Sequence, residues 1–136
     1  MDCDQAEAFV ERFRATWAAK EPAGFEALFH PDAVVRQPPV RDRFAGHQVG
    51  AYFAQVFATM PDLTLTTLDW AWRGNTVMIE WEINAAVGDA PLAWRGVDRF
   101  LLRDGLIDNE AVYFDSIRLW ERLDPSMWRD NMIALD

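Results

Sequence analysis

Residues 91–115 read PLAWRGVDRFLLRDGLIDNEAVYFD, and this stretch decides the fold class. Apolar and polar side chains alternate with a period of two on both sides of Asp104-Gly105, as in two strands joined by a tight turn. Residues 63–87 alternate in the same way around Arg73-Gly74-Asn75. Because each connection is short, four strands are expected to pair as an antiparallel meander, at 63–72, 76–87, 91–103 and 106–115.

The residues before this meander have the period of helices. Phe9, Phe13 and Trp17 recur every four residues within a helix expected at 4–20, which Asp4 would cap. Helices grouped beside an antiparallel sheet make an α+β class. The remaining elements expected here are helices at 23–29 and 46–60 and a short strand at 33–37.

The chain of 136 residues has the length of one domain. After the meander, Asp115 is expected to cap a short helix and Pro125 to open a last one. The expected single domain therefore has a core at about 4–123 and a C-terminal helical extension at 124–136.

Composition excludes several kinds of partner. The formal net charge of −9 argues against nucleic acid and against an anionic membrane, since both need clustered Lys and Arg. No apolar run approaches the roughly 18 residues that span a bilayer. The single cysteine, Cys3, cannot form an internal disulfide, and no basic-then-apolar leader opens the chain. A cytoplasmic protein is expected.

Neither a metal nor a cofactor is expected. The two histidines have no metal-ligand spacing, and the chain lacks a glycine-rich phosphate loop and a nucleophile elbow. His30 is expected to cap or pack. His47 is expected at the surface. The alternative is that its neutral imidazole lies over a pocket and acts there as a base. Arg36, Arg41 and Arg43 are expected in a solvated loop.

Short motifs spread over residues 4–123 resemble, in the same order, the nuclear transport factor 2-like superfamily, and within it SnoaL-like proteins. The resemblance implies a cone-shaped domain, in which a curved sheet wrapped by helices encloses one mostly apolar pocket. Similar proteins include polyketide cyclases, ketosteroid isomerases, limonene epoxide hydrolases, dehydratases and non-catalytic binders, so the fold does not determine the function. The motifs are Phe29-His30-Pro31-Asp32-Ala33, Gly46, Met60-Pro61-Asp62-Leu63, Gly74-Asn75-Thr76-Val77, Arg95-Gly96-Val97-Asp98-Arg99-Phe100, Arg103-Asp104-Gly105-Leu106-Ile107 and Tyr113-Phe114-Asp115.

Strand alternation predicts which side chains face that pocket. In 76–87 the apolar row is expected inward, which leaves Glu80 and Glu82 on the convex face. In 91–103 the row with three arginines is expected outward. Asp98 then points inward among apolar neighbours, where an unpartnered carboxylate is costly.

Asp98 and Glu110 are the candidate catalytic residues. If the turn at Asp104-Gly105 is a three-residue loop with a bulge, Asp98 lies opposite Glu110; a two-residue turn puts Asp98 opposite Ala111. Two carboxyl groups facing each other in an apolar pocket cannot both ionise cheaply, so the pair would share a proton and act as a general acid or base. The alternative to this pairing is that Glu110 lies at the open rim of the pocket and is solvated. Asp108 is expected on the same strand face as Glu110.

Bulky rings are unusually frequent for so short a chain, with seven Trp and nine Phe. A pocket walled by indoles suits a polycyclic or aromatic ligand. Val35 and Gln37 match positions that face the pocket in the resembled family, so they are also predicted to contact the ligand. Trp70 or Trp72 is a further candidate for the pocket wall. The predicted ligand contacts are Trp17, Val35, Gln37, Phe53, Phe57, Trp81, Ile83, Trp94, Phe100 and Phe114.

The chain departs from the enzymes that it resembles. Trp81 and Ile83 occupy positions where the epoxide hydrolases need Arg and Asp, and Val112 replaces a further Asp. No Tyr lies near Phe13 or Trp17, so the isomerase oxyanion donor is missing from that helix.

Three functions stay open. The first is cofactor-independent acid/base catalysis on a small hydrophobic carbonyl compound, of the cyclase, isomerase or dehydratase type, with Gln37 or His47 as hydrogen-bond partner. The second is non-catalytic binding of such a ligand. The third is a homo-oligomeric interaction module, with a homodimer as the expected assembly. Its interface would be the convex face that carries Met78, Glu80, Glu82, Val97 and Leu101.

Overall fold

A computed structural model describes residues 1–37, 41–87, 89–117 and 122. The predicted helical extension at 124–136 lies outside these residues. Asp115 was predicted to cap the short helix that precedes this extension. One hydrogen bond of this cap is described, in which the Ile117 N–H donates to Asp115 Oδ1 at 3.1 Å. The described elements are α1 (Cys3–Ala19), α2 (Pro22–Glu26), β1 (Phe29–Gln37), β2 (Arg41–Ala45), the 3₁₀ turn η1 (Gly46–Gln48), α3 (Val49–Thr59), β3 (Thr64–Arg73), β4 (Thr76–Val87), β5 (Ala90–Arg103) and β6 (Leu106–Phe114).

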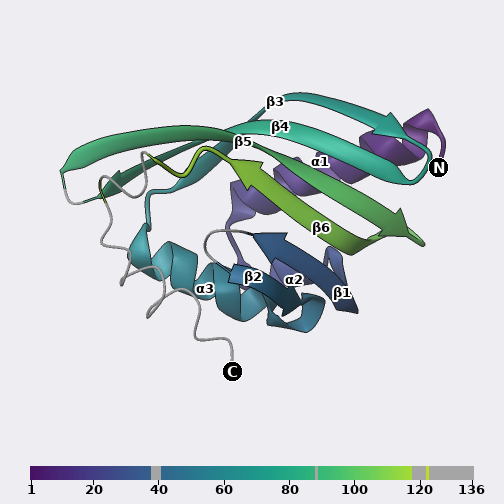
Figure 1. Ribbon diagram of the computed structural model, residues 1–136, viewed down its shortest axis with the longest axis horizontal. Helices are drawn as coiled ribbons and strands as arrows, with labels where there is room; N and C mark the ends of the chain where they lie inside the picture. The colour runs from purple at the N-terminus through teal and green to yellow at the C-terminus, as the bar shows by residue number, and fades with distance from the viewer. Residues whose placement is uncertain (38–40, 88, 118–121, 123–136) are drawn as a thin grey trace.

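One six-stranded sheet organises the fold, with the strand order β2-β1-β6-β5-β4-β3. The predicted antiparallel meander is confirmed for β3 to β6. β1 joins it by running parallel to β6. The sheet is curved and the long strands arch over the helices, so the predicted α+β class is confirmed (Figure 1). None of the described helices is long and apolar enough to cross a membrane.

Helix α1 starts one residue earlier than the sequence predicted, and its N-cap lies two residues earlier. Asp2, not Asp4, is the N-cap: its carboxylate accepts from the Gln5 N–H at 2.9 Å, and Gln5 Oε1 accepts from the Asp2 N–H at 3.0 Å. This reciprocal pair satisfies two backbone donors that a helix start leaves unpaired. The predicted face of Phe9 and Phe13 is buried in the core.

Strand β2 was predicted as a loop, and that prediction was wrong. Its residues pair antiparallel with β1, with Val35 opposite Phe44. Phe44 is buried in this strand, and Arg43 is exposed. Edge strands tolerate charged side chains, so they need not show alternating apolar residues. This segment is a strand because it pairs with β1.

Both predicted registers of the β5–β6 hairpin were wrong. The turn has two residues, Asp104 and Gly105, with φ of 52° and 78°, and Arg103 pairs with Leu106. A bulge then shifts the register of β6 between the pairs Leu102–Ile107 and Leu101–Asn109. A bulge inserts one unpaired residue into a strand. As a result Asp98 pairs with Val112, and Glu110 pairs with Phe100.

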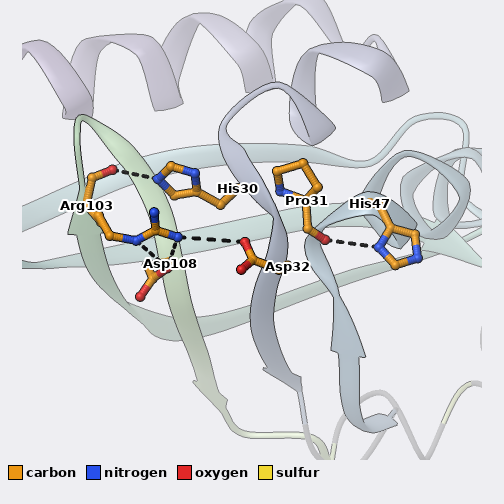
Figure 2. Close-up of polar contacts among 6 residues, drawn as sticks. All are labelled: His30, Pro31, Asp32, His47, Arg103 and Asp108. Atoms are coloured by element: carbon orange, nitrogen blue, oxygen red, sulfur yellow. Dashed lines mark hydrogen bonds and ion pairs between the residues drawn. The ribbon is translucent and has the colours of Figure 1, made fainter.

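The bulge also turns Asp108 to the outer face, contrary to the expected alternation. There its Oδ1 accepts from Arg103 Nη2 at 2.7 Å, and the same guanidinium lies 3.7 Å from Asp32 (Figure 2). His30 packs as predicted, with Nε2–H donating to the Arg103 carbonyl at 2.7 Å. These contacts fasten the start of β1 to the β5–β6 hairpin.

Candidate functional site

A cavity lies between the concave face of the sheet and helices α1 and α3. It holds about 660 Å³ of space free of protein atoms, counting its open mouth. The residues that line it are Trp17, Val35, Gln37, Phe44, Val49, Tyr52, Phe53, Val56, Met60, Leu63, Leu65, Trp81, Ile83, Trp94, Asp98, Glu110, Val112 and Phe114.

Most of the predicted ligand contacts fall in this lining, and four candidate rings do not. Phe100 lies in the core behind the cavity, edge-on to Phe9 with ring centroids 5.2 Å apart. Phe57 packs beneath Lys20, whose Nζ is 5.1 Å from the ring centroid. Neither of the alternative walls, Trp70 and Trp72, lines the cavity.

Asp98 points into the cavity because it belongs to the inward row of β5. Its side chain is 6% exposed, and its Oδ1 has no hydrogen-bond partner in the described protein. Burial raises the pKa of Asp98 to about 7, against a smaller lowering by the neighbouring Trp81 indole. The Trp81 Nε1 does not reach hydrogen-bond geometry and is itself unpartnered. Two complementary polar atoms thus lie side by side, unpaired.

Glu110 is buried rather than placed at a solvated rim, so that alternative was wrong. Its side chain is 9% exposed. Burial raises the pKa of Glu110 well above its ordinary value, and the charge of Asp98 raises it further. Since β5 and β6 place both carboxyl groups on the concave face, the pair cannot be fully ionised at neutral pH without large cost.

Tyr52 is the polar cavity residue that sequence reasoning missed. It projects from α3, is 3% exposed and lines the cavity. Burial raises the pKa of Tyr52, a hydrogen bond with Gln37 opposes the rise, and the charges of Glu110 and Asp98 add to it.

A usable signal for Tyr52 did exist in the sequence. Tyr52 follows Val49 by three residues and precedes Val56 by four, so it belongs to the buried stripe of α3. A hydroxyl on an otherwise apolar helix stripe must find a partner in the interior. The identity of that partner, Gln37 on β1, depends on how the helix packs against the sheet.

Gly96 sets the position of the Trp81 indole. The two residues pair across β4 and β5, and a Cβ on Gly96 would lie 2.5 Å from the Trp81 ring. The bare glycine backbone lets the indole lie over β5, where its Nε1 borders Asp98.

Positive charge is missing from the cavity lining among the described residues. Arg95 binds Glu82 at 2.9 Å on the outer face, and Arg99 donates to Asn109 at 2.7 Å. His47 is exposed and donates from Nδ1 to the Pro31 carbonyl at 3.0 Å (Figure 2), so it is not a partner of Asp98. No group of three potential metal ligands occurs within the described part of the chain. The chemistry of the cavity therefore comes from carboxyl, phenol, amide and indole groups.

The comparisons with known proteins agree with the observed fold. A family model described as a SnoaL-like domain matches residues 10–109. The chain belongs to the SnoaL-like family. The resemblance inferred from the sequence motifs is thereby confirmed. A search of curated proteins found no match.

Solved structures share the fold of this SnoaL-like protein. TsrD from Streptomyces laurentii superposes with a TM-score of 0.75 at 19% identity, covering 92% of this chain and 98% of that one. A putative SnoaL-like polyketide cyclase from Jannaschia sp. CCS1 gives 0.76 at 14%, covering 88% and 91%. IdmH, a putative polyketide cyclase from Streptomyces antibioticus, gives 0.72 at 17%, covering 87% and 97%. At these identities the likeness establishes the fold alone.

Proposed function

We propose that this SnoaL-like protein binds a small hydrophobic molecule in its cavity and that Asp98 exchanges a proton with it, without a cofactor. One observation carries the proposal: Asp98 Oδ1 is buried, faces the cavity and has no partner in the described protein. A buried polar atom without a partner is costly, and a bound ligand would supply that partner.

The groups around Asp98 suit general acid/base chemistry. A carboxyl group with a pKa of about 7 holds and releases protons near neutral pH, where acid/base catalysis is most efficient. Glu110 adds a second buried carboxyl group on the adjacent strand, and burial raises its pKa. Tyr52 supplies a phenol O–H toward a ligand carbonyl oxygen, replacing the tyrosine that is missing from α1.

Enolisation of a carbonyl compound is the reaction step that this set supports. Asp98 would take a proton from the carbon next to the carbonyl while Tyr52 donates a hydrogen bond to the oxygen, and the returned proton would complete an isomerisation, cyclisation or dehydration. The names of two structural neighbours, putative polyketide cyclases, make aromatic polyketides the first compounds to test.

The test has a binding stage and a chemical stage. Thermal-shift and native mass spectrometry screens with aromatic polyketides, steroids and terpenoids should find stabilisation by at least one class. For a ligand that binds, NMR in deuterated water should show exchange of its acidic C–H protons. Asp98→Asn should abolish the exchange while binding persists.

Glu82→Gln is the matched control, because Glu82 lies on the outer face in an ion pair with Arg95. It should leave both binding and exchange unchanged. Binding without exchange in the wild type would establish the non-catalytic alternative. A screen in which no class binds would remove the ligand proposal altogether.

A second proposal concerns the outer face of the sheet, which we infer pairs with another copy of the chain. Met78 is 43% exposed there, with Leu101 and Tyr113 also exposed on neighbouring strands. Large apolar side chains gathered on one face are typical of an interface. Light scattering should give a dimer mass, and Leu101→Asp should give a monomer; an unchanged mass would exclude this face. The proposal includes a cytoplasmic location, in keeping with the free cysteine Cys3.

A further inference from the structure

We propose that the ligand of this cavity carries one positive charge, on a protonated or alkylated nitrogen. The inference rests on the proposed function only in that the cavity is the ligand site, and it does not depend on proton transfer. It narrows the ligand from hydrophobic molecules in general to hydrophobic organic cations.

Charge within the cavity is the first support. Asp98 and Glu110 reach it from β5 and β6, and no Lys, Arg or His lines it within the described ranges. The arginines of the same hairpin bind elsewhere: Arg103 holds Asp108 at 2.7 Å on the outer face. Two buried acidic groups without a cation are otherwise relieved only by protonation, so an entering cation would supply the missing counter-charge.

The walls of the cavity are the second support. A cation over an aromatic face is attracted by the ring quadrupole, most strongly over Trp, and the attraction grows when water is excluded. Quaternary ammonium groups such as that of choline are recognised in proteins by cages of aromatic rings. The rings that line this cavity come from α1, β2, α3, β4, β5 and β6, and they are Trp17, Phe44, Tyr52, Phe53, Trp81, Trp94 and Phe114.

The unpaired atoms Asp98 Oδ1 and Trp81 Nε1 are the third support. A protonated Asp98 gives the indole N–H a weak acceptor. Once a cation favours the ionised carboxylate, the adjacent N–H becomes a charge-assisted donor to it. The Trp81 indole already lowers the pKa of Asp98 in this sense. A neutral ligand would not favour the ionised carboxylate, so the Trp81 N–H would be left with only a weak acceptor.

Linkage predicts how such binding depends on pH. The titratable groups that face the cavity are Asp98 from β5, Glu110 from β6 and Tyr52 from α3, while α1 and β4 present the indoles of Trp17 and Trp81. Tyr52 stays protonated, since burial raises its pKa. Below the pKa of Asp98, a cation binds by displacing one proton, so its affinity rises by up to about tenfold per pH unit and levels off above about pH 7.

The experiment compares choline with its neutral carbon isostere, in which a tert-butyl group replaces the trimethylammonium group. Calorimetry should show choline binding at least tenfold more tightly above neutral pH. The preference should shrink as the pH falls below neutral. In buffers of different ionisation enthalpy, the measured heat should report the release of a proton.

Substitutions test which carboxyl groups produce the preference for the cation. Asp98→Asn and Glu110→Gln should each reduce the preference for the cation, and either one suffices if the other does not fold. Glu82→Gln, on the outer face, should leave the preference unchanged. Equal affinity for choline and its isostere, or a preference that survives both variants, overturns the inference while the cavity remains a site for hydrophobic ligands. If neither choline nor any neutral hydrophobic compound binds at any pH, the ligand site itself is refuted.

Discussion

Asp98 and Glu110 are diagonal neighbours on the concave face of the sheet. Asp98 pairs across the hairpin with Val112, and Glu110 pairs with Phe100, so the two carboxyl groups are offset by two residues. Diagonal side chains on adjacent strands have Cβ atoms at most about 7–8 Å apart. That separation lets one charge raise the pKa of the other and leaves room for a ligand atom between them.

The buried Asp98 should make the protein less stable as pH rises. In the unfolded chain this carboxyl ionises near about 3.9, whereas folding raises its pKa to about 7. Between those values the folded state holds a proton that the unfolded state has lost, so the free energy of unfolding falls with rising pH and levels off above about 7. The full effect is roughly 4 kcal/mol at most.

Asp98→Asn removes the contribution of Asp98 to this dependence, whereas the raised pKa of Glu110 maintains a contribution of its own. Urea unfolding should therefore show the variant to be more stable than the wild type at about pH 8 and to have no such advantage at about pH 4. Glu82→Gln should not flatten the profile, because Arg95 lowers the pKa of Glu82 rather than raising it. A wild-type profile that rises between about pH 4 and 7 would contradict the assignment of Asp98 as a proton-bearing group.

The same variant should change the titration of its neighbour. Since the charge of Asp98 raises the pKa of Glu110, Asp98→Asn should lower it, although burial keeps it above its ordinary value. Carbon NMR of the Glu110 carboxyl measures the shift. An unchanged Glu110 titration would mean that the two groups do not interact.

Gly96→Ala should disturb the cavity wall. Its Cβ would lie 2.5 Å from the Trp81 ring and 2.7 Å from the Tyr113 carbonyl oxygen. Overpacking of this kind costs about 1–3 kcal/mol, measured by urea unfolding, and should shift the fluorescence of the displaced indole. Gly24→Ala is the matched control, because its nearest neighbour would be 3.9 Å away. Equal effects of the two substitutions would refute this role for Gly96.

Tyr52→Phe should remove the hydrogen bond with Gln37 while keeping the ring in place. The expected cost is about 1 kcal/mol in urea unfolding, typical of one internal hydrogen bond. Gln37→Leu should add little to Tyr52→Phe, since both remove the same bond.

The sequence by itself determined the α+β class, the β3–β6 meander and the inward position of Asp98. These follow from local rules: side chains in a strand alternate between two faces, and turn residues mark where strands end. Alternation was reliable along β4 and β5, where no bulge interrupts the register: Trp81 and Trp94 face inward, and Glu80 and Arg95 face outward.

Only the tertiary structure decided how the polar groups of the cavity meet. The bulge at Asp108 sets the offset between Asp98 and Glu110, and Arg103 donates hydrogen bonds to the Asp108 carboxylate that it turns outward. β2 exists because β1 pairs with it, and Tyr52 meets Gln37 because α3 packs across the sheet. Each depends on how separate elements pair or pack, and no periodicity within one element encodes that geometry.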